Sequence, residues 1–464
     1  MAVSVYRAAT QSISHDEALT YLLFIRGSWH RPFAYTGNQN HVLLAILSKA
    51  VLAVAPTNEL ALRAPVLATT ILFAGAALFL VRRLVEDAWL RVTGLAVLLL
   101  NPYTMDFLVA ARGYGMMLAF IFIALCLLLP FSDRAPGRAR VGGAGVALGL
   151  SMAANPVSLF PAGGLVVAFV AGEALWGRFA NGMRRAITLV AAATVVSVPL
   201  LAPQMARAKR ADYYLGAGTI ITSIGSLVRA SWSHRDPYID SVAALTRLEL
   251  GALVLTLLLL VSITIIAASC VPRWSAGRAR ERALVWLWIV MAVTAAEVVA
   301  AHWVVAVPYP AGRTGLYWMP MFALAGILAF ARVRTHPICR GLGWLTIVLV
   351  LAADVLRFQT TTFADWSYDA PGRAIISRLT ADHEKTGTPV SLGGSWQVEP
   401  AMNFYRVTRG LDWMAPIERR PPTPGDDYYV FMKADAGIAA DLGLRTLMED
   451  PGSGTMLAVP RGRP

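Results

Sequence analysis

Long apolar stretches separated by short polar connections fill the chain from about residue 60 to 357. Because about 20 apolar residues cross a bilayer as a helix, such stretches predict membrane spans. We predict ten, at about 60–81, 90–106, 114–131, 141–154, 157–175, 186–202, 248–270, 283–303, 315–331 and 342–357. The apolar segment 41–55 is shorter and contains Lys49, so we expect an interfacial or re-entrant helix there.

The pattern changes at both ends of this region. Residues 1–58 are mixed in polarity and form a predicted first outer loop, with an amphipathic helix from Asp16 to about Ile25. Residues 359–464 regain charge and turn residues, which predicts a small α/β domain. Its expected elements are helices at 371–384, 399–408 and 435–442 and strands at 388–393, 411–415, 427–432, 444–448 and 454–459.

Arginine is concentrated in every second connection between the spans, from Arg82-Arg83 to Arg332 and Arg334. The positive-inside rule places these connections in the cytoplasm and the others, with the first loop and the C-terminal domain, outside. An outer N-terminus would need a span upstream of this sequence, so we expect a first transmembrane helix to be missing. Alternatively, residues 41–55 cross the bilayer and place Asp16 in the cytoplasm.

Composition supports the membrane assignment. The 464 residues are 56% hydrophobic and 15% charged, with a mean hydropathy of +0.56, which excludes an ordinary soluble protein. The net charge of +13 lies largely in the short loops, so it does not indicate nucleic-acid binding. The three cysteines form no metal-ligand or disulfide pattern, and because the first fourteen residues have no apolar run, we expect no signal peptide within them.

The first candidate for chemistry is Ser14-His15-Asp16-Glu17-Ala18, just before the apolar region. Ser14 and Glu17 have the spacing of a capping box, which is the structural interpretation. The functional interpretation makes Asp16 the chemical centre, with Glu17 and His15 beside it.

Other polar residues gather on the same predicted side of the membrane. Asp106 precedes Arg112 and Tyr114 at the mouth of two spans. These residues form either a functional cluster or a purely structural ion pair between Asp106 and Arg112. His302, Tyr309 and Arg313 occupy one outer loop, and Arg313 has the side chain best suited to phosphate. The long loop 203–247 carries a set of charged and aromatic residues, most of which we expect to be solvated surface: Arg207, Lys209, Arg210, Arg229, Trp232, His234, Arg235 and Asp236.

The order of several segments resembles the GT-C glycosyltransferases, in particular the bacterial protein O-mannosyltransferase and aminoarabinose-transferase branch. The segments are His15-Asp16-Glu17-Ala18, Asn40-His41-Val42-Leu43, Asn58-Glu59-Leu60-Ala61-Leu62-Arg63-Ala64-Pro65, and Glu399-Pro-Ala-Met-Asn-Phe-Tyr-Arg. The resemblance implies that Asp16 is the catalytic base, that Glu17 supports it and that Asp106 is the second acidic residue. It also implies phosphate binding at His41, although the family's two prolines after this position are replaced here by Val42-Leu43.

These observations predict a polytopic α-helical, GT-C-like protein of the bacterial inner membrane, with a transmembrane domain (1–358) and an extracytoplasmic α/β domain (359–464). Its expected function is inverting transfer of a sugar from a polyprenyl-phosphate donor to a hydroxyl or phosphate of a protein, glycan or lipid acceptor. Asp16, Glu17 and Asp106 are the expected catalytic residues, with no cofactor or metal. The substrate-binding residues are expected to be His15, His41, Arg112, Tyr114, His302, Tyr309 and Arg313. The alternative is a transporter or flippase for lipid-linked sugars without catalysis.

Overall fold

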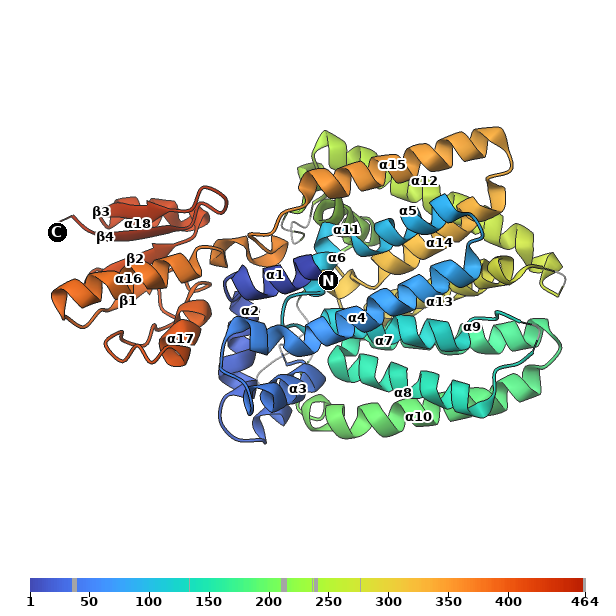
Figure 1. Ribbon diagram of the computed structural model, residues 1–464, viewed down its shortest axis with the longest axis horizontal. Coiled ribbons are helices and arrows are strands. Elements are labelled where there is room, and N and C mark those ends of the chain that lie inside the picture. The colour runs from blue at the N-terminus through green and yellow to red at the C-terminus, as the bar shows by residue number, and fades with distance from the viewer. Residues whose placement is uncertain are drawn as a thin grey trace.

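The computed structural model describes residues 1–35, 40–132, 134–209, 215–235, 237, 241–275 and 277–461. Up to residue 357 it is a bundle of helices (Figure 1). Within these residues, six segments are long and apolar enough to cross a membrane: Glu59–Leu84 (α4), Pro156–Leu175 (containing α9, Leu159–Leu175), Phe179–Met205 (α10), Arg247–Arg273 (containing α12, Arg247–Cys270), Ala279–Val305 (α13) and Pro337–Arg357 (α15). Shorter helices occupy the other expected spans: Ala88–Leu99 (α5), Gly113–Leu128 (α7), Arg138–Ala154 (α8) and Trp318–Val333 (α14). The predicted class, a multi-pass helical membrane protein, is confirmed.

The expected span 90–106 is wrong in one respect, because the helix breaks inside it. The helix α5 ends at Leu99, and a short helix α6 (Pro102–Phe107) begins after Asn101. Pro102 has no amide hydrogen to continue the first helix, and the Asn101 side chain accepts a hydrogen bond from the Thr104 amide at 3.1 Å. The break turns the chain so that Asp106 enters the site described below.

Short helices make up much of the described part of the first loop, including a 3-10 turn, η2 (Arg31–Phe33). Ala2–Thr10 (α1) was not expected, whereas the predicted helix at 16–25 is present as α2 (His15–Thr20) followed by a π-helical turn, η1 (Tyr21–Ile25). The segment at 41–55 forms Val42–Leu52 (α3), whose 11 residues span only about 17 Å. This length fits the expected interfacial or re-entrant helix and is too short for a full span.

The C-terminal region is a small α/β unit. After η8 (Ala364–Asp369) come α16 (Gly372–Thr386), β1 (Leu392–Gly394), α17 (Glu399–Thr408), β2 (Tyr428–Phe431), α18 (Ala436–Asp441), β3 (Leu444–Glu449) and β4 (Met456–Pro460). The sheet order is β1-β2-β4-β3, with β1 and β2 parallel and the other pairs antiparallel. The predicted strand at 411–415 is wrong, since this segment forms only an isolated bridge between Met414 and Val390.

This unit lies at one end of the bundle, beside α1 and α2 (Figure 1). One apolar core continues from the bundle helices into it. The Tyr21 ring packs edge-on against Phe404 at 5.1 Å, and the Tyr405 hydroxyl donates to Glu59 of α4 at 2.8 Å. The C-terminal unit is therefore packed firmly against the first loop.

Candidate active site

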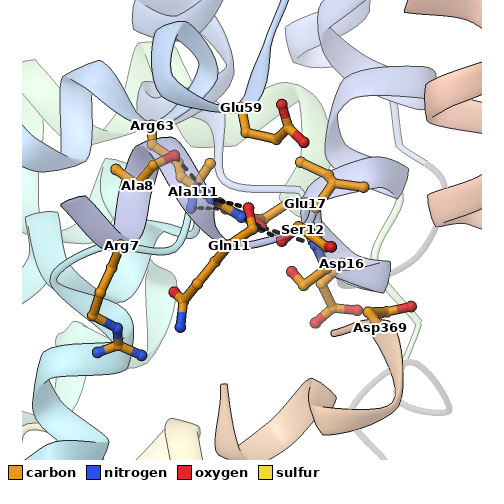
Figure 2. Close-up of polar contacts among 12 residues, drawn as sticks. Arg7, Ala8, Gln11, Ser12, Asp16, Glu17, Glu59, Arg63, Ala111 and Asp369 are labelled. Carbon is orange, nitrogen blue, oxygen red and sulfur yellow. Dashed lines mark hydrogen bonds and ion pairs between the residues drawn. The ribbon is translucent and has the colours of Figure 1, made fainter. Parts of the chain in front are cut away.

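The site is built around α2, which carries Asp16 and Glu17 on one short turn. Glu17 Oε2 accepts the backbone amide of Ser14 at 3.0 Å, as the capping interpretation predicts. Glu17 also receives Arg63 of α4 at both oxygens, at 2.8 and 2.7 Å, and the Ala111 amide at 2.5 Å. Figure 2 shows Glu17 and Arg63 at the centre of these contacts. Glu17 is thus fully buried and enclosed by donors, in a position that fixes α2 to the bundle.

Asp16 points to two other guanidinium groups. Its Oδ2 lies 3.1 Å from Arg313 Nη2 and 3.5 Å from Arg112 Nη2, and the side chain is buried. Burial by itself would raise the pKa of Asp16, but Arg313 and Arg112 outweigh it and lower the pKa to about 2. Asp16 is therefore a buried carboxylate that is ionised at neutral pH.

The two arginines reach Asp16 from different parts of the chain. Arg112 precedes α7 and also donates to the Asp16 carbonyl at 3.2 Å and to the Thr20 hydroxyl at 2.9 Å. Arg313 comes from the loop between α13 and α14, contacts Asp365 at 3.2 Å and lies over the Trp366 ring at 5.3 Å. The predicted grouping of Asp16, Arg112 and Arg313 is present in the structure.

Asp106 forms a second ion-pair cluster instead of the Asp106–Arg112 pair considered from the sequence. Arg7 Nη2 donates to Oδ1 at 2.5 Å, and Oδ2 accepts both His234 Nε2 and the Ala364 amide at 2.8 Å. Burial would raise the pKa of Asp106, but His234 and Arg7 lower it overall. Burial alone would lower the pKa of His234, but the charge and the hydrogen bond of Asp106 together outweigh burial and raise it.

Of the loop residues expected to be mostly solvated, Arg207, Lys209 and Arg235 are exposed, but Arg229 and the His234 side chain are not; Arg210 and Asp236 lie outside the described residues. The loop contains the helix α11 (Ile220–Ser233), and Arg229 on it is 1% exposed. His234 follows as the C-cap with a φ of +48°, a left-handed conformation that is uncommon outside glycine. This conformation directs the imidazole to Asp106.

His41 and Tyr114 line the same region. His41 Nδ1 lies 2.9 Å from the Ala154 carbonyl and so carries the hydrogen, and the ring meets Tyr114 edge-on at 5.3 Å. Burial, reinforced by Arg112, holds the pKa of His41 well below its usual range. Among the described residues, Nε2 of this buried imidazole has no hydrogen-bond partner, so it is available as an acceptor.

Three predicted site residues have other partners. His15 contacts the C-terminal unit, with Nδ1 2.5 Å from the Gln397 carbonyl. His302 stacks on Tyr309 with ring centroids 4.1 Å apart, and its Nδ1 lies 2.9 Å from the Val307 carbonyl. Tyr309 is also joined to Ala217 by a two-bond backbone bridge. His302 and Tyr309 thus stabilise the loop that leads to Arg313.

A large apolar cavity of about 580 Å³ adjoins this region. Its wall includes Thr104 of α6, Ser231 of α11 and Pro310 of the Arg313 loop, so it shares three elements with the polar site. The rest of the wall comes mainly from apolar side chains of α5, α12, α13, α14 and α15.

Several residues of the site were missed from the sequence: Arg7, Arg63, His234 and Asp365. A charged residue near the start of a membrane span is itself a functional signal, so Arg63 could have been identified from the sequence. The others had none, because they lie in mixed or loop segments where charge is ordinary.

No protein-family model and no curated protein matches this sequence. Among solved structures, the chain is similar to ArnT from Cupriavidus metallidurans bound to undecaprenyl phosphate, at 13% identity and a TM-score of 0.45, covering 98% of this chain and 96% of that one. The apo form of the same protein gives 14% identity and a TM-score of 0.48, with 98% and 95% covered. The oligosaccharyltransferase AglB from Archaeoglobus fulgidus gives 13% identity and a TM-score of 0.44, with 100% and 70% covered. Likeness at this level concerns the overall course of the chain and says nothing about the reaction.

Proposed function

We propose that this protein is a membrane glycosyltransferase that moves one sugar from a polyprenyl-phosphate donor to a hydroxyl or phosphate acceptor. The observation that carries the proposal is the buried Asp16 carboxylate between Arg112 and Arg313, next to an apolar cavity. A base, two phosphate-binding cations and an apolar space for a lipid tail are the groups that such a reaction requires. The site and the C-terminal unit would face the outer side of the bacterial inner membrane.

With a hydroxyl acceptor, Asp16 is the general base. The acceptor oxygen forms a bond to the anomeric carbon from the side opposite the phosphate, and its proton passes to Asp16. The bond from the anomeric carbon to the phosphate oxygen breaks, and the polyprenyl phosphate leaves with the electron pair. Such a single displacement inverts the anomeric centre.

The arginines connect donor binding to the strength of this base. With a pKa of about 2, Asp16 is a weak base as long as Arg313 and Arg112 have no bound phosphate to neutralise them. An anionic phosphate bound to the same guanidinium groups would share their charge and bring a negative charge near Asp16. Donor binding should therefore raise the pKa of Asp16 and make it a better acceptor of the proton.

This coupling predicts a specific pH dependence. A general base works only when ionised, so the rate falls as the pH decreases through its pKa. The acid limb of kcat, which reports the donor complex, is expected at a higher pH than the acid limb set by free Asp16, whose pKa is about 2. Steady-state rates across the acid range, with donor at saturating and at low concentration, measure both limbs, and coincident limbs would contradict the coupling.

The apolar cavity is the proposed site of the prenyl tail. Ala323→Trp on α14 would fill part of it, because Ala323 lies in the cavity wall. The KM for a long-chain donor is expected to rise about tenfold, while a donor with a truncated tail is affected much less. Val92→Trp on the exposed side of α5 is the matched control and should change neither KM. An equal effect of Ala323→Trp on both donors would contradict the assignment.

We propose that transfer requires no metal. In the described ranges, no group of three or more His, Cys, Asp or Glu side chains is placed to hold a metal ion. Arg112 and Arg313 would instead balance the charge on the departing phosphate. Treatment of the purified protein with a chelator is expected to leave the transfer rate unchanged, and a loss that added divalent cation restores would refute this proposal.

Reconstituted vesicles test the function as a whole. Vesicles holding the protein and a polyprenyl-phosphate sugar are given candidate acceptors, and both the glycosylated acceptor and the released polyprenyl phosphate are measured. Equal amounts of the two products support transfer. Movement of an intact lipid-linked sugar across the bilayer, without release of polyprenyl phosphate, would support the flippase alternative.

A further inference from the structure

Asp369, the last residue of η8, contributes a further carboxyl group from the C-terminal unit. Its Oδ2 accepts the backbone amide of His15, the first residue of α2, at 2.5 Å. Figure 2 shows its side chain next to Asp16, and both acids are buried. Asp369 is therefore hydrogen-bonded to the residue that directly precedes the proposed base.

The surroundings of Asp369 disfavour a negative charge. The carboxyl group is 3% exposed, and Oδ1 has no hydrogen-bond partner among the residues that the structure describes. Charges nearby are already paired or have the same sign. Asp16 and Glu17 of α2 are acidic, Arg313 is held by Asp16 and Asp365, and Arg373 of α16 by Glu59.

We propose that Asp369 is a positioning residue that works as an uncharged carboxyl group, holding the start of α2 through the His15 amide while adding no second charge beside Asp16. The role rests on the proposed transferase function, because Asp16 matters as its base. Burial, together with the charges of Asp16 and Glu17, also raises the pKa of Asp369 well above its usual range. A protonated Oδ1 and an accepting Oδ2 are compatible with the observed contact.

The asparagine variant distinguishes a neutral hydrogen-bond acceptor at position 369 from a carboxylate whose negative charge is needed. Asp369→Asn keeps a neutral side chain with an oxygen for the His15 amide, so transfer near neutral pH is expected to stay within about threefold of the native rate. Asp369→Ala loses the acceptor and should reduce the rate at least tenfold. Asp412→Asn, at an exposed position of the same unit, is the matched control and should leave the rate unchanged. An equal loss in Asp369→Asn and Asp369→Ala, or full activity in Asp369→Ala, would overturn the proposal.

The pH profile provides a readout that a purely structural role would not change. Ionisation of Asp369 at high pH places a second negative charge beside Asp16 and opposes the donor phosphate at Arg313. The donor KM of the native protein should therefore rise on the basic side, and that rise should be missing in Asp369→Asn. Identical KM profiles for the two proteins would contradict the proposal.

An infrared difference spectrum tests the protonation directly and without turnover. The carbonyl stretching band of a protonated carboxyl group should be present at neutral pH in the native protein and lost in Asp369→Asn. A missing band refutes the inference, whatever the protein catalyses. If the band is present and no sugar transfer is found in the vesicle assay, the proposed function fails while the assignment of a neutral Asp369 stands.

Discussion

Asp16→Asn is expected to reduce sugar transfer by a factor of about 10² to 10⁴, the usual contribution of a positioned general base. The amide is nearly the same size but cannot take the acceptor proton. Donor binding should persist or strengthen, because Arg112 and Arg313 lose the carboxylate that shares them. The rate is measured as glycosylated acceptor formed in reconstituted vesicles, and donor affinity is measured separately in the same preparation.

A carboxylate outside the site is the control for this substitution. Asp382 on α16 pairs with Arg378 at 3.0 Å, and that arginine is 53% exposed. Asp382, 16% exposed, also accepts a hydrogen bond from the Tyr428 hydroxyl, and Asp382→Asn should leave transfer unchanged because both partners belong to the C-terminal unit and lie outside the site. If Asp16→Asn folds, binds donor and still makes product at the native rate, Asp16 is not the base.

Arg63→Met is expected to lower the free energy of unfolding by about 3–5 kcal/mol, which is typical when one partner of a buried ion pair is removed. Arg63 donates to both Glu17 oxygens and to the carbonyls of Ala8, Gln11 and Ser12. The substitution leaves Glu17 as an uncompensated charge with no exposed surface. The decrease in the free energy of unfolding is measured by denaturation in detergent, monitored with a spectroscopic probe attached to the first loop.

Two further variants test whether the loss of stability comes from the buried Glu17–Arg63 ion pair. Arg280→Met removes a partner of Glu86, which is 64% exposed, and should cost at most about 1 kcal/mol. Glu17→Gln with Arg63→Met should cost less than the sum of the single changes, because it removes the stranded charge. A loss in Arg63→Met no larger than that in Arg280→Met would show that the Glu17–Arg63 pair does not hold the first loop.

Much of the fold could be predicted from hydropathy alone. Each expected span corresponds to at least one helix, because long apolar stretches have few other stable forms in a membrane. The break at Asn101-Pro102 had a local signal in the proline, but the apolar residues around it favoured one span. The strand expected at 411–415 was wrong because short apolar runs do not specify a partner strand.

The candidate site was predictable only in part. Asp16 was singled out by its adjacent acid and its place before the spans, and Arg112 and Arg313 by the positive charge in short outer loops. The pairing of Asp106 with Arg7 and His234 joins residues 99 and 128 positions apart, and no local pattern encodes such contacts. The same holds for Asp369, whose bond to His15 spans 354 positions.

The contacts of η8 determine when, during synthesis of the chain, the polar clusters can be completed. The Ala364 amide, the Asp365 carboxylate and the Asp369 carboxyl each complete a cluster begun by residues near the start of the chain or by a loop of the bundle. A ribosome must synthesise more than three-quarters of the chain before the last of these residues exists. Until then, a nascent chain could insert its helices into the membrane, but the Asp106 cluster and the start of α2 would lack the partners that η8 supplies.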